Sequence, residues 1–204
     1  MKLKARTASI VLVLGVSGSA IAVSSTAGAD PFRFTATVKA QTTLAKLQQT
    51  VVIPPGKFHG AITSGNNNVG HLTGTLKLPP ATTTLKITGI GLATVTVSLV
   101  PTKKVVGTLN PSTFLLVATS RFNIHVNSVK PLGLPVNVVG NNCVTSTPVK
   151  LTFSGTISPL SGGSVSGTYT IPRLANCGAV TAVLNAAVAG PGNTFTATMV
   201  PSLN

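Results

Sequence analysis

Hydrophobic and polar residues alternate one by one along most of the chain after residue 30. The segment 32–39 reads FRFTATVK and the segment 72–78 reads LTGTLKL. Such alternation places apolar side chains on one face of an extended chain and polar ones on the other, as in half-buried β-strands. Thr and Val dominate these runs, and Pro stands mostly at their ends, where a missing amide disturbs a β-ladder least. The pattern predicts an all-β protein.

Three shorter segments depart from simple alternation. The segments 41–49 and 179–189 contain neither Pro nor Gly, so each could form a short helix. The run FLLV at 114–117 is apolar throughout and predicts a fully buried strand.

Four stretches of the first half recur in the same order in the second half, which predicts an internal duplication with insertions in the loops. The matching pairs are 33–38 with 121–126, 58–63 with 153–158, 72–79 with 165–172, and 95–101 with 195–201. Each copy carries glycines inside predicted strands, at Gly60 and Gly74 and again at Gly155 and Gly167. A glycine there indicates a bulge or a close approach by a neighbouring backbone.

The two copies define the predicted domain organisation. Residues 30–119 form a first β repeat plus a bridging strand, and residues 120–204 form a second β repeat that contains both cysteines. A repeat of this size is marginal alone, so we expect the two to share a core or to pack face to face. The predicted fold is an antiparallel β-sandwich, immunoglobulin-like or related.

The N-terminal segment 1–29 predicts a secretory signal peptide. Basic residues precede an apolar run at 8–23, and AGA at 27–29 supplies the small residues that a signal peptidase reads. We place cleavage between Ala29 and Asp30, which predicts a secreted protein with no transmembrane segment in the mature chain. In an exported protein Cys143 and Cys177 are expected to form a disulfide, and closing that loop would contribute up to ~4 kcal/mol.

The charge balance is unusual, because the chain has fifteen Lys and Arg and a single carboxylate side chain, Asp30. Acid/base pairs, hard-metal sites and oriented triads nearly all require Asp or Glu, so we predict no enzyme, no metal and no cofactor. The mature chain would carry about +11, spread along the sequence. With no Trp and one Tyr it lacks the stacking residues of a nucleic-acid-binding protein, so we expect no nucleic-acid partner.

Three His residues are the side chains expected to titrate near neutrality. A hairpin turn in the Gly- and Asn-rich stretch after residue 64 would place His59 opposite Thr75 and His71 opposite Thr63. The two imidazoles would then be too far apart to share a metal ion. Together with His125, they are predicted to lie on polar strand faces.

The second half also carries short motifs that resemble a known family. They are GNNC at 140–143, SGG at 161–163, GTYTIP at 167–172, NCG at 176–178 and GPGNTF at 190–195. With these motifs the chain resembles an abundant family of actinobacterial secreted proteins of unknown function. The resemblance implies export and a β-rich fold, and it brings no activity or site residue with it.

These observations predict a secreted, non-catalytic binding or structural protein of the cell envelope or extracellular space. Its cationic surface would favour anionic wall polymers or lipid headgroups. A first alternative, suggested by the high apolar fraction, is a carrier of apolar ligands in a cavity between sheets. A second is a hydrolase that uses Ser and His alone, although no Gly-x-Ser-x-Gly motif is present in the mature chain.

Overall fold

A computed structural model of the chain describes residues 30–65 and 69–202. The predicted signal peptide and the tip of the first hairpin lie outside the described residues. The elements are β1 (Phe32–Leu44), β2 (Gln49–Ser64), β3 (Gly70–Lys77), β4 (Ala81–Ile87), β5 (Gly91–Leu109), β6 (Leu115–Pro131), β7 (Val144–Thr145), β8 (Val149–Ser158), β9 (Gly162–Ile171), β10 (Leu174–Ala175), a 3-10 turn (Gly178–Val180), α1 (Thr181–Val188) and β11 (Gly190–Ser202).

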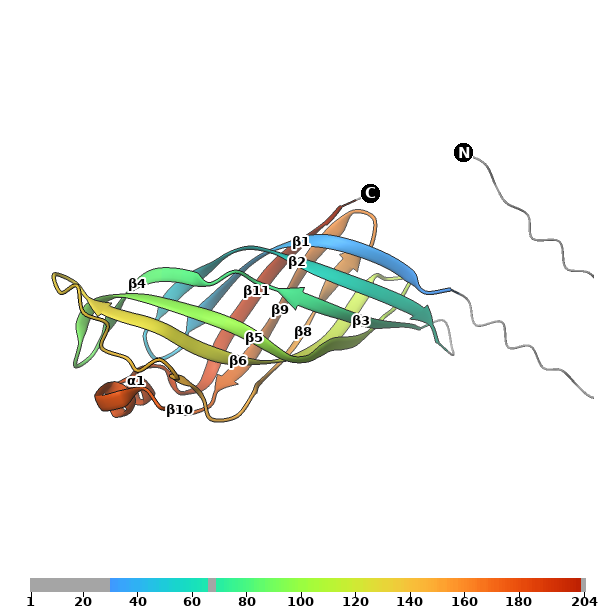
Figure 1. Cartoon of the computed structure of the whole chain (residues 1–204). Helices are drawn as coiled ribbons and strands as arrows, with labels where there is room; N and C mark the ends of the chain where they lie inside the picture. The colour runs from blue at the N-terminus through green and yellow to red at the C-terminus, as the bar shows by residue number, and fades with distance from the viewer. Residues whose placement is uncertain (1–29, 66–68, 203–204) are drawn as a thin grey trace, which may run out of the picture.

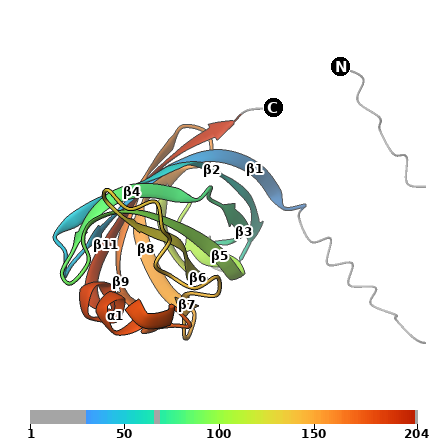
Figure 2. The same cartoon turned by 60° about the vertical axis from the view of Figure 1, so that its left-hand side comes forward.

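Eight of the strands close into an antiparallel barrel, in the order β1–β2–β3–β5–β6–β8–β9–β11. The ring closes because β11 pairs along β1 and because β5 pairs along β6. The strands wrap around a common interior, and α1 lies at one end of the barrel, beside β10 (Figures 1 and 2). All-β structure is therefore confirmed.

The predicted sandwich is not confirmed. A sandwich needs two sheets with open edges, whereas here the edges of both halves are joined by long antiparallel ladders. The buried side chains form a single core. The predicted boundary at residues 119 and 120 falls inside β6. The duplication and the two-repeat division stay predictions, and the registers differ, since Phe58 faces Leu76 while its counterpart Phe153 faces Gly167.

At one place in the barrel wall, a side chain makes the hydrogen bonds that backbone groups of a neighbouring strand would otherwise make. The long strand β5 pairs with β4 through its first half and with β3 through its second half, so β3 and β4 act as one interrupted strand. Opposite β4, the Gln49 amide of β2 donates from Nε2 to the Lys86 carbonyl at 3.2 Å and accepts from the Lys86 amide at 3.0 Å. The side chain thus replaces a missing strand partner.

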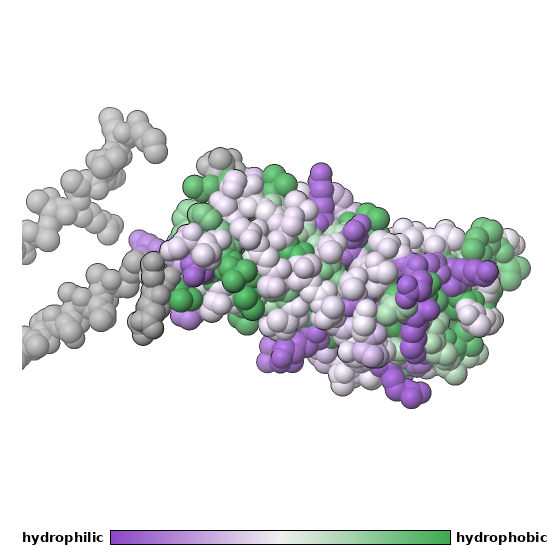
Figure 3. Space-filling model, turned by 180° about the vertical axis from the view of Figure 1, so that it is seen from behind, coloured by the Kyte–Doolittle hydropathy of each residue, from purple (hydrophilic) through white to green (hydrophobic). Residues whose placement is uncertain are grey.

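The alternation read from the sequence separates the inside of the barrel from the outside. In β1, Ala36, Val38 and Ala40 are buried while Lys39 is exposed. On the outer face, hydroxyl side chains stand opposite one another across six strands, at Thr119, Thr152, Thr168, Thr194, Thr43 and Thr50. In Figure 3 the hydrophobic surface is concentrated toward the two ends of the molecule.

The local predictions have mixed outcomes. The helix predicted at 179–189 is confirmed as α1, but the one predicted at 41–49 is wrong, because β1 runs to Leu44 and β2 begins at Gln49. The run 114–117 does enter a strand, yet it is not fully buried, since Leu116 faces the interior while Leu115 and Val117 are exposed. Ordinary strand alternation outweighs the apolar composition there.

The register of the first hairpin is confirmed, with His59 opposite Thr75 and His71 opposite Thr63. The predicted close approach by a neighbouring backbone is confirmed at Gly155 and Gly167, where a Cβ would lie 2.1 Å from the Ser164 carbonyl oxygen and 2.3 Å from the Thr152 carbonyl oxygen. At Gly74 the closest neighbour is a side chain: a Cβ would lie 2.2 Å from the Phe58 ring, so the glycine makes room for this ring inside the barrel.

Candidate functional site: an apolar cavity inside the barrel

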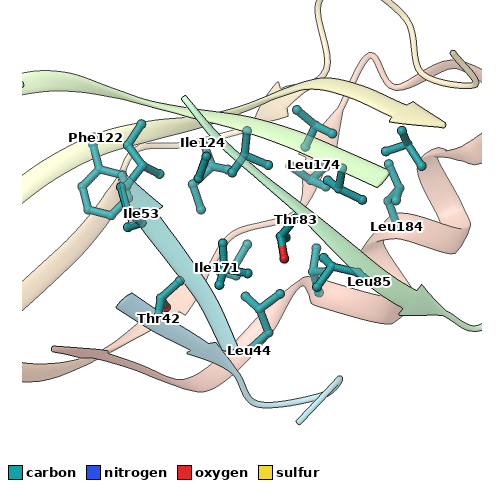
Figure 4. A pocket seen from close by; sticks show the side chains of 18 of the residues that line it. Thr42, Leu44, Ile53, Thr83, Leu85, Phe122, Ile124, Ile171, Leu174 and Leu184 are labelled. Atoms are coloured by element: carbon teal, nitrogen blue, oxygen red, sulfur yellow. The ribbon is translucent and has the colours of Figure 1, made fainter. Parts of the chain in front are cut away.

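The interior contains an apolar cavity of about 90 Å³ at the α1 end. Its lining is almost wholly apolar and mostly aliphatic, and it comes from strands around the barrel and from α1, as the converging side chains of Figure 4 show. Labelled examples are Leu44 of β1, Ile53 of β2, Leu85 of β4, Ile124 of β6, Ile171 of β9 and Leu184 of α1. These residues meet because every second residue of each strand faces inward.

A second apolar cavity of about 60 Å³ lies deeper, toward the opposite end of the barrel. The side chains of Leu99, Phe122 and Phe195 line both cavities and separate them. The Phe122 ring also meets the Tyr169 ring edge-on, with centroids 6.5 Å apart. Movement of these side chains would join the two spaces into one longer apolar channel.

The larger cavity has one pair of hydrogen-bonded hydroxyl groups in its wall. The Thr42 hydroxyl lies 2.6 Å from the Tyr169 hydroxyl and donates to the Thr194 carbonyl at 2.8 Å. Since Thr42 has a single hydroxyl hydrogen, Tyr169 is the donor between the two side chains. Burial raises the pKa of Tyr169, and its hydrogen bond with Thr42 partly offsets that rise. At neutral pH the phenol therefore stays protonated, and its oxygen keeps lone pairs that can accept a further hydrogen bond.

The α1 end of the cavity is closed by a cap that the disulfide holds. Leu184 and Val188 of α1 face the cavity, and the Cys143–Cys177 bond joins the chain before β7 to the chain before the 3-10 turn, with Cα atoms 4.2 Å apart. The disulfide predicted from the sequence is confirmed. It fixes the cap across a sequence separation of 34 residues.

Side-chain amides hold the rest of this cap. The buried Asn185 of α1 accepts from the Leu174 amide at 2.6 Å and donates to the Leu174 carbonyl at 2.9 Å. Asn193 accepts from the Ala45 amide at 3.1 Å and donates to the Gly190 carbonyl at 2.9 Å. In a chain with one carboxylate side chain, neutral amides thus do the bonding that charged groups often do.

The basic side chains from residue 30 onward are all exposed. Some lie directly opposite one another on neighbouring strands: Lys57 faces Lys77, and Arg121 faces both Lys103 and Lys150. Like charges in such positions destabilise a sheet. We call these two sets the basic rows: Lys57 with Lys77, and Lys103 with Arg121 and Lys150.

The three His lie outside the cavity. His59 and His71 are exposed, and the His59 Nδ1 lies 3.1 Å from the Thr35 hydroxyl. His125 is half-buried and lies opposite Ser98 across β5 and β6. The Ser98 hydroxyl oxygen accepts a hydrogen bond from the Asn127 side-chain amide at 2.7 Å, and not from His125. Within residues 30–65 and 69–202, no group of three His, Cys, Asp or Glu side chains is arranged to hold a metal ion.

The predicted cleavage site lies at the edge of the described residues. Ala29 lies outside them, and Asp30 is the first described residue and is exposed.

Sequence reasoning identified no residue of the cavity as a ligand contact. Tyr169 is the sole Tyr of the chain and lies at an inward position of a predicted strand, which is the signal that could have marked it. Thr42 gave no such signal, because its segment was predicted as a possible helix and its partner is far away in sequence. Phe122 and Phe195 resembled ordinary core residues.

Comparisons of the chain with protein-family models, with curated proteins and with solved structures find no match. The resemblance to actinobacterial secreted proteins therefore stays a prediction. In the part of the chain that the structure describes, no helix has the length and apolar character needed to cross a bilayer.

Proposed function

We propose that the protein is a secreted, non-catalytic binding protein that holds a small apolar ligand inside its barrel. This is the carrier function expected as an alternative from the apolar composition, with the binding space inside a closed barrel instead of between two sheets. Eight-stranded barrels are just wide enough to be filled by side chains or to hold one small ligand. The observation that carries the proposal is the apolar cavity beside α1.

The size of the cavity limits the ligand. Apolar cavities of about 150 Å³ in other proteins stay dry and bind benzene or xenon. The 90 Å³ space is smaller, so it fits a xenon atom or the end of an alkyl chain, and a ring such as that of toluene would also need wall side chains to shift. A longer chain would need Phe122 and Phe195 to turn and open the second cavity.

The free energy of an empty cavity supports a ligand. At roughly 24 cal/mol per Å³, leaving 90 Å³ unfilled costs on the order of 2 kcal/mol. Burying a ligand there would recover that cost. The Tyr169 hydroxyl would accept a hydrogen bond from a polar end group, such as an alcohol.

Titration calorimetry with toluene and with decanol tests this function. We expect toluene to bind at one site, and Ile124→Phe, which fills the cavity, to weaken it by at least about tenfold. Phe122→Leu, which widens the passage between the cavities, is expected to strengthen decanol binding. The matched control is Val117→Phe on the outer face of the same strand. If neither compound binds the wild-type protein, the proposal is wrong.

The basic rows support a second candidate function, binding of a linear anionic polymer. Lys57 with Lys77, and Lys103 with Arg121 and Lys150, repeat across neighbouring strands about 4.8 Å apart. An anionic chain laid across the strands would relieve their repulsion. The test is retention of the protein on immobilised polyglutamate. Retention that decreases with added salt, and that is weaker for Lys150→Gln than for Lys39→Gln, would support this function. Equal retention of the two variants would contradict it.

A further inference from the structure

The loop between β6 and β7 presents an apolar tip at the α1 end of the barrel. Leu132 is 68% exposed, Leu134 58% and Val136 60%, and the neighbouring Leu92 at the start of β5 is 46% exposed. Scattered single aliphatic residues on a surface are ordinary, but four in one place form a patch of the kind that marks an interaction site. We call these four side chains the apolar tip.

The backbone of this loop is anchored, so the exposure is built into the fold. The Leu132 amide donates to the Leu92 carbonyl at 2.7 Å, which ties the tip to β5. At the base of the loop, the Asn137 side-chain oxygen accepts from the Val129 amide at 3.0 Å and from the Val139 amide at 3.3 Å. The loop backbone is therefore fixed to the ends of β5 and β6, while its aliphatic side chains stay exposed.

Two lysines flank the tip on the outer surface. Lys86 lies directly opposite Leu92 across β4 and β5, and Lys130 precedes the loop at the end of β6. Both are exposed. The sole carboxylate side chain of the protein, Asp30, precedes β1 at the other end of the barrel, so it does not offset these charges.

We propose that the apolar tip docks on a lipid bilayer with anionic headgroups, its aliphatic side chains entering the acyl region while Lys86 and Lys130 meet the phosphates. Apolar residues flanked by cations are the combination that binds proteins to such an interface. A polyanion in water would gain nothing from exposed leucines. Protein interfaces are anchored by aromatic and Arg side chains, and this tip has neither.

The location of the tip relates the docking to the cavity. Ile87 at the end of β4 and Val129 near the end of β6 line the cavity, and the tip extends from the same strand ends. A bilayer bound there would lie next to the α1 end of the cavity. Docking nevertheless depends only on the tip and its lysines, so it goes beyond the proposed ligand binding and can be tested separately.

The test is flotation of the mature protein with lipid vesicles. Two compositions are compared: phosphatidylcholine alone, and phosphatidylcholine mixed with phosphatidylglycerol. We expect the protein to float with the anionic vesicles and much less with the neutral ones. The double variant L132S/L134S is expected to lose binding by at least about tenfold. Its matched control is Leu160→Ser, because Leu160 is 67% exposed but lies in the β8–β9 turn at the opposite end.

A charge comparison completes the experiment. Lys86→Gln with Lys130→Gln should weaken binding to anionic vesicles, and Lys57→Gln with Lys77→Gln, on the barrel side, should leave it unchanged. These surface changes leave the core intact, which a thermal melt checks. The proposal is overturned if wild-type protein does not float, or if the barrel-side pair weakens binding as much as the tip pair. It is also overturned if L132S/L134S floats like wild type, whether or not the substitutions change the self-association of the protein.

Discussion

The two halves of the barrel interior are built differently. In the half next to α1, aliphatic side chains line the wall and a cavity of about 90 Å³ remains. In the opposite half, aromatic rings fill more of the space, with Phe34 and Phe58 packed at a centroid distance of 5.8 Å over Gly60 and Gly74. The second cavity, which lies in this opposite half, measures about 60 Å³.

The difference shows how one barrel holds both a densely packed region and an unfilled apolar space. A glycine in the wall lets an aromatic ring approach the backbone, so the interior fills where strand glycines meet Phe58. At the α1 end, aliphatic side chains leave space that a separate cap covers. We therefore expect substitutions in the two halves to have different consequences.

The largest effect is expected where the two halves meet. Phe122→Ala would remove the ring that divides the cavities and should cost about 3–5 kcal/mol of unfolding free energy. Denaturant unfolding measures this cost, with Phe32→Ala, at a 48% exposed position, as the control. A loss below about 1 kcal/mol would mean that the ring does not fill the interior as described.

The next largest effect concerns the cap of the α1 half. Replacing Cys143 and Cys177 together by Ser should cost about 2–4 kcal/mol, because the unfolded chain regains the freedom that the disulfide removes. Hydrogen exchange should show α1 losing more protection than β3 and residues 57–64 of β2, because local opening of the cap adds to the global loss of stability. Equal loss in both halves would contradict a local cap.

A third substitution tests the filled half. Gly74→Ala places a Cβ against the buried Phe58 ring and should cost about 1–3 kcal/mol from overpacking. In a Phe58→Leu background the same substitution should cost much less, because the ring is gone. Additive costs in this double-mutant cycle would show that the ring and the glycine do not interact.

The sequence predicted local features in both halves of the barrel. In the filled half, alternation and turn residues predicted the register of β2 against β3. At the α1 end, short-range signals predicted the helix α1 and the disulfide. Barrel closure depends instead on β1 meeting β11 and β5 meeting β6, and strand patterns are the same in a sandwich and in a barrel.

The cavity was unpredictable for a related reason. Its wall combines residues such as Thr42 and Tyr169 that are far apart in sequence, and its volume depends on how inward side chains pack. The disulfide was predictable because it needs only two cysteines and an oxidising location. The amide bonds of Asn185 to Leu174 could not be read from composition.

A smaller effect, a fall of the unfolding free energy at alkaline pH, is expected from the α1 half alone. Tyr169, in the α1 half, has a pKa raised above the ordinary value of 10.0 by burial. As the pH rises, Tyr169 therefore ionises in the unfolded chain before it ionises in the folded protein. The free energy of unfolding is unaffected below about pH 10 and should fall as the pH rises from there through the folded-state pKa. Tyr169→Phe should remove this alkaline slope and cost about 0.5–1.5 kcal/mol at neutral pH. Tyrosinate absorbance, which reports this residue alone, is the measurement; ionisation at the ordinary pKa would contradict burial.

The smallest effect is expected in acid, where neither half should respond. Acid unfolding normally follows the protonation of carboxylates whose folded-state pKa is depressed. With Asp30 as the one carboxylate side chain, we expect nearly constant melting temperature between about pH 3 and 5.5. A steep fall across that range in thermal scans would contradict this account of the charge balance.

A crystal of the protein pressurised with xenon would show most directly whether the apolar space beside α1 accepts a ligand. We expect xenon density between Ile53, Ile124 and Leu184, with a weaker site or none on the far side of Phe122. Ordered water in that space, or side chains that fill it and leave no xenon, would contradict the claim.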